Sequence, residues 1–112
     1  MSEQIAAYQF ADGVFYRLKK PLNKKGLGMT LKSCKELLTL FYSQGWETYE
    51  IWAFVDTLIY EMKKNLFPLD FRMFYAITYR YLSSGQYAVT EEKVQAKYRD
   101  WINKTIEELK AS

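Results

Sequence analysis

Histidine is absent from this chain of 112 residues, and cysteine occurs once, as Cys34. Without histidine, the chain has neither an imidazole for acid–base catalysis nor the commonest protein ligand for transition metals. A single cysteine can form no disulfide within the chain and no cysteine cluster for zinc. Because a thiol needs an activating base to act as a nucleophile, we expect Cys34 to be a buried, unreactive core residue.

The acidic residues offer little for catalysis. Glu47, Glu50, Asp56 and Glu61 gather around one predicted helix, in a pattern typical of surface acids that balance nearby lysines. They have no histidine or cysteine beside them, so neither a metal site nor an acid–base pair is indicated. We therefore expect a protein that is not an enzyme, with no catalytic residues, no metal-binding residues and no cofactor.

Long apolar stretches are also missing. No part of the sequence approaches the roughly 18 consecutive apolar residues that would cross a membrane. The first residues, MSEQIAAYQFADG, contain neither the basic leader nor the apolar segment of a secretory signal. These features predict a cytoplasmic protein with no membrane partner.

The composition itself is that of a globular protein, with 49% hydrophobic and 26% charged residues. We expect residues 1–112 to form a single domain. Aromatic residues make up 18% of the chain, including ten tyrosines, and a core of this size cannot bury all of them. Some aromatic side chains should therefore form a binding face, or else lie half-buried with solvated hydroxyls.

Apolar residues recur at helical spacing between every pair of proline and glycine positions. The expected helices span about Glu3–Leu18, Thr30–Ser43, Thr48–Leu66, Pro68–Ser84, and the chain from Thr90 almost to its end. The third helix carries the strongest apolar stripe, formed by Ile51, Val55, Leu58, Ile59, Met62 and Leu66. Asp12-Gly13 could divide the first helix, and Thr30 is a plausible N-cap. No period-2 alternation indicates a strand. The predicted fold is all-α, a compact bundle of four to five helices in which short loops make consecutive helices pack antiparallel.

One segment carries charge of a single sign. Between Gly13 and Lys35 there are seven cations and no acid, and the next acid is Glu36. The seven cations are Arg17, Lys19, Lys20, Lys24, Lys25, Lys32 and Lys35. Such a field concentrates polyanions, so we expect these residues to contact a nucleic-acid backbone without reading its sequence. The alternative is a solvated loop that keeps the protein soluble.

A second candidate surface lies on the fourth predicted helix. A helical projection places Arg72, Tyr79 and Arg80 on the side opposite the apolar stripe, with Tyr75 at its edge. Arginine beside tyrosine can hold a phosphate and stack on a base. The same pair is enriched in protein-binding hot spots, and a half-buried boundary against the first helix is also consistent with the pattern.

With its size, its helix content and its basic edge, the whole chain resembles the small helical subunits of multi-subunit, class 1 CRISPR effector complexes. The resemblance implies a non-catalytic subunit that holds nucleic-acid backbone within a ribonucleoprotein, beside other protein subunits or further copies of itself. It transfers no residue roles, because it concerns architecture alone. The alternatives are a protein-binding adaptor or phage-encoded inhibitor that uses the aromatic surface, and a helix-turn-helix regulator.

Overall fold

The structure is a computed structural model, described here for residues 4–84 and 92–111, with only the backbone described for 92–97. Within these residues the chain forms helices and no strand. The helices are α1 (Ala7–Leu18), α2 (Leu27–Ser43), α3 (Thr48–Lys64), α4 (Phe71–Ser83) and α5 (Glu92–Ala111). The predicted all-α class is confirmed. Gly85 and Thr90, expected to bound the fourth and fifth helices, lie outside the described residues.

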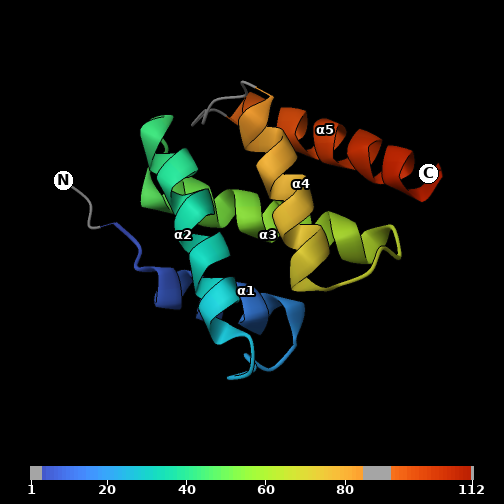
Figure 1. Ribbon diagram of the computed structural model, residues 1–112. Helices are drawn as coiled ribbons and strands as arrows, with labels where there is room; N and C mark the ends of the chain where they lie inside the picture. Colours follow the sequence, from blue (N-terminus) through green and yellow to red (C-terminus); the bar gives the residue numbers. More distant parts are fainter. Residues whose placement is uncertain (1–3, 85–91, 112) are drawn as a thin grey trace.

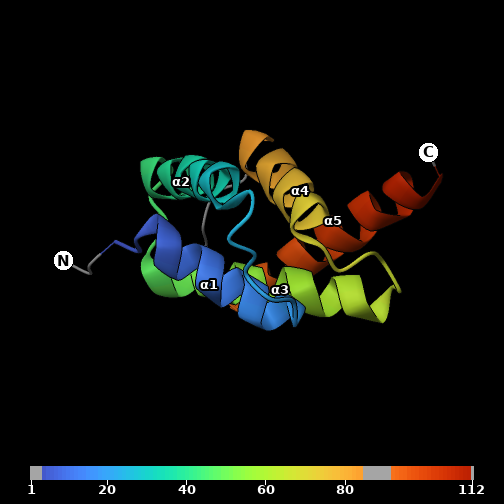
Figure 2. The ribbon, with the colours of Figure 1, turned by 60° about the horizontal axis from the view of Figure 1, so that its bottom comes forward.

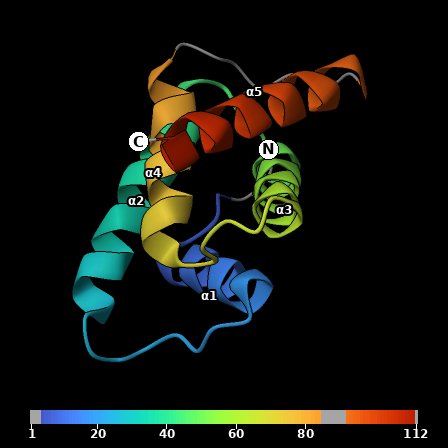
Figure 3. The same cartoon turned by 90° about the vertical axis from the view of Figure 1, so that its right-hand side faces the viewer.

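The helices form two layers, and the chain changes layer at each connection. α3 lies in the middle of one layer, between α1 and α5 (Figure 3). The other layer holds α2 and α4, which lie side by side, run in the same direction and cross over α3 (Figure 1). Figure 2 shows α1 and α3 together beneath this second layer.

This alternation overturns the expected packing order. Consecutive helices were predicted to pack antiparallel as neighbours, but within each layer the neighbours are two helices apart in sequence. Within the part of the chain that the structure describes, only α1 and α2 combine adjacency in sequence with close backbone packing. The connections carry the chain between layers, so the helix that follows along the chain does not take the adjacent place.

Aromatic rings fill the space between the layers. The ring of Phe54, on α3, is fully buried and lies 4.8–5.9 Å from the ring centroids of Phe41, Trp46, Tyr81 and Tyr98. These four rings come from α2, the connection that follows it, α4 and α5. Each such pair contributes roughly 0.5–1.5 kcal/mol beyond simple burial. Phe54 therefore links four parts of the chain into one core.

Three helices end in the same way, with one residue in the left-handed conformation. Gly45 holds this position after α2 with φ 88°, but α1 uses Lys19 (φ 58°) and α3 uses Leu66 (φ 55°). After α3, the amide of Phe67 donates to the carbonyl of Met62 and the amide of Leu66 to that of Lys63. These are the two hydrogen bonds of a Schellman motif.

The prediction that Leu66 continues the apolar stripe is wrong. Its side chain is 91% exposed, and the side chain of Phe67 packs against the core instead.

Two predicted helix starts are also wrong. α2 begins at Leu27 with Gly26 as N-cap, so Thr30 lies inside its first turn. α4 begins at Phe71 rather than at Pro68, because Asp70 supplies a better cap: its carboxylate accepts a hydrogen bond from the amide of Met73 at 2.9 Å.

Gly13 does not interrupt α1. The helix continues through it to Leu18, and a Cβ at this position would lie 2.4 Å from the ring of Trp52 on α3. The glycine is therefore where α1 and α3 approach closely, and it gives the indole room to lie between Phe10 and Arg17.

Candidate nucleic-acid interface

The connection between α1 and α2 presents four of the predicted lysines. Lys19 directly follows α1, and Lys20, Lys24 and Lys25 come after it. All four side chains are exposed, and we call these four lysines the basic loop. Leu22 anchors the connection by packing against the core. The side chain of Asn23 accepts a hydrogen bond from the amide of Lys25 at 3.0 Å, which forms a turn. The connection that carries the lysines lies at one end of the molecule (Figure 1), and the turn held by Asn23 orders its second half.

The charge of the basic loop is not neutralised from within the described chain. None of the four lysines forms an ion pair with another described residue. The N-terminus of α2 follows directly, with no acid in its first turn and no side-chain cap. The positive end of that helix dipole adds to the same local field.

Arg17, predicted to belong to the same basic stretch, turns inward. Its Nε lies 2.5 Å from the Oδ1 of Asp56 on α3, and one of its terminal nitrogens donates to the carbonyl of Gly13. The guanidinium also stacks over Trp52, with 4.5 Å between Cζ and the ring centroid. Arg17 therefore ties α1 to α3 and offers less charge to a partner than the lysines do.

The second predicted surface extends across α2 and α4. Arg72, Tyr79 and Arg80 are exposed on α4, as the projection predicts. Tyr75 stacks on Tyr79 with ring centroids 5.8 Å apart. Its hydroxyl donates to Glu36 of α2, and this bond to a carboxylate raises the pKa of Tyr75 to about 12.

Along α4, Arg72 and Arg80 are eight residues apart, which is about 12 Å on a helix. Arg72 stands near the start of α4, and exposed Lys32 lies in the first half of α2. α2 and α4 run in the same direction, and both begin at the end that holds the basic loop (Figure 1). Lys32 and Arg72 are therefore the residues of this face that lie nearer to the basic loop. Arg80 and Tyr79 lie farther along it.

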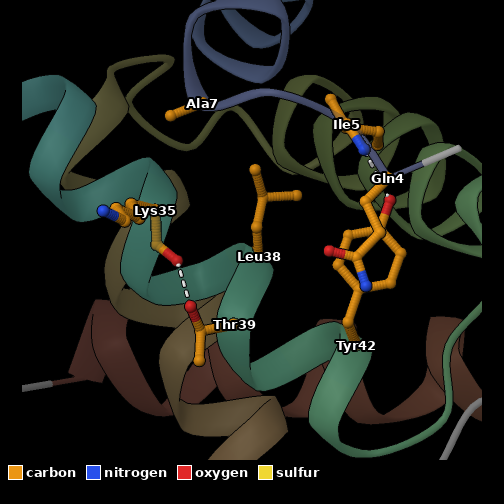
Figure 4. A pocket seen from close by; sticks show the side chains of 7 residues that line it. All are labelled: Gln4, Ile5, Ala7, Lys35, Leu38, Thr39 and Tyr42. Carbon is orange, nitrogen blue, oxygen red and sulfur yellow. Dashed lines mark hydrogen bonds between the residues drawn. The ribbon is translucent and has the colours of Figure 1, made fainter.

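Lys35 belongs to a different place. It lines a groove of about 540 Å³ between α2 and the residues that precede α1 (Figure 4). In that groove the hydroxyl of Tyr42 accepts a hydrogen bond from the amide of Ile5 at 2.9 Å, which fastens the N-terminal segment to α2. Figure 4 shows the Lys35 side chain extending away from Ile5 and Tyr42.

The spacing of residues gave no sign of a further groove between α1 and α3. This α1–α3 groove encloses about 380 Å³ and is lined by Tyr16, Arg17, Lys19, Asp56, Ile59, Tyr60 and Lys63. Tyr16 is 82% exposed and Tyr60 is 62% exposed. The two tyrosines come from different helices, so only the packing of α1 on α3 brings them to one groove. Lys19 belongs to both the groove and the basic loop.

Comparisons with protein families, curated proteins and solved structures give no match. The roles of these surfaces are therefore argued from their own residues.

Among the described residues, no group of three or more cysteine, aspartate and glutamate side chains could hold a metal ion. No described helix combines the length and the apolar character needed to span a bilayer.

Two of the acids expected at the surface are buried. Glu50 is 6% exposed, and its Oε1 accepts a hydrogen bond from the amide of Glu47 at the start of α3 at 2.8 Å. Glu61, taken as a surface counterweight to lysines, is fully buried between α3 and α5. Its Oε1 accepts from Asn103 at 3.1 Å and lies 3.7 Å from Arg99, while Asn65 donates to Asn103. A signal was available, because Glu61 stands three residues after Leu58 on the apolar stripe. This network orders α5 against α3, away from the basic loop.

Cys34 is fully buried, and burial raises the pKa of its thiol to about 12. The thiol therefore remains protonated at neutral pH, as expected for a core residue. It faces none of the candidate surfaces.

Proposed function

We propose that this protein is a non-enzymatic helical subunit that binds nucleic-acid backbone through the basic loop, without sequence specificity, within a larger ribonucleoprotein. The observation that carries the proposal is the position of the four lysines Lys19, Lys20, Lys24 and Lys25. They are exposed on the connection between α1 and α2, without an ion pair to any described residue. Flexible ammonium groups on such a connection can follow a chain of phosphates.

The surroundings of the basic loop support the same reading. Lys32 and Arg72 extend the positive surface onto α2 and α4, and the nearby acid Asp56 is engaged by Arg17. The helices that carry these residues are held by a buried aromatic core, so binding requires no reorganisation of the fold. Membership in a CRISPR effector complex remains a prediction from the architectural resemblance.

Charge reversal at the basic loop tests this function. The variant Lys20→Glu, Lys24→Glu, Lys25→Glu should bind a single-stranded oligonucleotide roughly tenfold or more weakly than wild type at moderate salt. The matched control is Lys64→Glu, Lys104→Glu, Lys110→Glu, which reverses three exposed lysines on α3 and α5 and changes the net charge equally. A helical circular dichroism spectrum establishes that both variants fold.

Only the loop variant should lose affinity. Equal losses in both variants would mean that net charge alone attracts the polyanion, and the basic loop would then have no special role. If wild-type protein binds no nucleic acid at all, the proposed function is wrong.

A second function is favoured by one observation on α4. Tyr79 and Arg80 are exposed beside the stacked ring of Tyr75, and this composition is typical of protein-binding hot spots. A protein-binding adaptor or inhibitor would use this face. Such binding would survive charge reversal of the basic loop and fail when Tyr79 and Arg80 are replaced by alanine.

A further inference from the structure

We propose that the α1–α3 groove holds an unpaired base of a single-stranded nucleic acid, while Lys19 and Lys63 bind the adjoining phosphates. The inference rests on the proposed function, because the strand must first be held by the basic loop. It adds a site that makes the protein prefer single strands to duplexes.

The two tyrosines of the groove are the first support. Tyr16 is 82% exposed and Tyr60 is 62% exposed, so neither ring is needed to fill the core. They project from different helices into one groove. Exposed aromatic rings beside cationic side chains are the usual platform for unpaired bases, because every base has a face that can stack.

The charges of the groove are the second support. Asp56 is the one acid among its lining residues, and its carboxylate is paired with Arg17 at 2.5 Å. Lys19 and Lys63 line the same groove, and neither forms an ion pair with a described residue. The groove therefore combines aromatic faces with two uncompensated cations, which complements a base and its flanking phosphates.

Size and position agree with this occupant. A volume of about 380 Å³ lies near the lower end of the range for small-molecule sites, roughly 300–1,000 Å³. Lys19 is shared with the basic loop, so a strand bound along the loop reaches the groove without a gap. A duplex keeps its bases stacked within the helix and cannot place one between the two tyrosines.

The test compares three DNA probes with equal numbers of phosphates on each strand: an intact single strand of about 12 nucleotides, the same strand without bases, and a duplex. The protein variants are Tyr16→Ala and Tyr60→Ala, with Tyr16→Phe and Tyr60→Phe keeping the ring. Tyr49→Ala is the matched control, because Tyr49 lies on α3, is 63% exposed and does not line the groove.

Wild type should bind the intact strand about 5- to 150-fold more tightly than the abasic strand. The alanine variants should lose most of that difference, whereas the phenylalanine variants and Tyr49→Ala should keep it. The salt dependence of binding should be the same in the tyrosine variants and in wild type, because no phosphate contact is removed.

Equal affinity of wild type for intact and abasic strands would overturn the inference and leave the proposed function standing. A preference for duplex, or alanine variants that bind like wild type, would also overturn it. Alanine variants that lose binding to an acidic peptide while keeping that to DNA would assign the groove to a protein partner. Absence of binding to every probe would instead defeat the proposed function, and the inference with it.

Discussion

Replacing Lys19 by glycine should strengthen the fold and weaken binding at the same time. Lys19 holds the left-handed position after α1, with φ 58°. That conformation costs a residue with a Cβ roughly 1–2 kcal/mol, and glycine avoids the cost. Glycine also loses about 0.4–1 kcal/mol more backbone entropy on folding. The net gain is about 0.5–1 kcal/mol in the free energy of unfolding, or roughly 2–6 °C in Tm.

The same substitution removes one cation from the place where the basic loop meets the α1–α3 groove. If Lys19 contacts a phosphate, its loss should lower the slope of log affinity against log salt by roughly 0.7–0.9. A protein that is more stable yet binds less well cannot owe its weaker binding to unfolding. Thermal melts and oligonucleotide titrations at several salt concentrations measure the two effects.

Leu66→Gly is the matched control for this prediction. Leu66 has the same conformation after α3, with φ 55°, and its side chain is 91% exposed, so little burial is lost. This variant should be stabilised to a similar extent and should bind nucleic acid like wild type. The reasoning is refuted if Lys19→Gly is less stable than wild type, or if it binds with an unchanged salt dependence.

Three further predictions concern the scaffold and the second surface. Gly13→Ala should lower the free energy of unfolding by up to about 2 kcal/mol. Overpacking against Trp52 costs roughly 1–3 kcal/mol, whereas the helix preference for alanine over glycine returns only about 1 kcal/mol. In a Trp52→Leu background, where the ring is gone, the same change should stabilise the protein. Cys34 should react with thiol reagents at pH 8 only after unfolding. Burial raises the pKa of the Cys34 thiol from about 9 to about 12, so between these pH values the thiol ionises in the unfolded chain but stays neutral in the folded one. The free energy of unfolding should therefore be fully retained below pH 9 and decline as the pH rises toward 12, and Cys34→Ala should lack this part of the decline. Arg72→Ala, Arg80→Ala should leave Tm nearly unchanged, since both side chains are exposed and form no ion pair with a described residue, and should weaken retention of nucleic acid; an early melt would show that they are structural.

Periodicity was sufficient to predict the helices, because the core is built from stripes that each helix carries within its own sequence. The stripe of Ile51, Val55 and Leu58 predicts α3, and Gly45 marks the end of α2. Leu66 was misassigned because an apolar residue at the right spacing extends a stripe on paper, whereas the helix end is set by the contact of Phe67 with the core.

The features that sequence could not supply depend on contacts between distant parts of the chain. Gly13 reads as a breaker until Trp52 is placed against it. The basic stretch was visible as a run of charge, but the departure of Arg17 toward Asp56 requires the packing of α1 on α3. Tyr16 and Tyr60 share a groove for the same reason, and the alternation between layers is what sets that packing.

The most direct test of backbone binding by the basic loop is the salt dependence of affinity for a single-stranded oligonucleotide. We expect wild type to show a clear linear decline of log affinity with log salt. Lys20→Glu, Lys24→Glu, Lys25→Glu should reduce the slope by roughly 2–3, because each lost phosphate contact removes about 0.7–0.9. Slopes that are equal in wild type and in this variant would mean that the basic loop touches no phosphate, and the account would be contradicted at its centre.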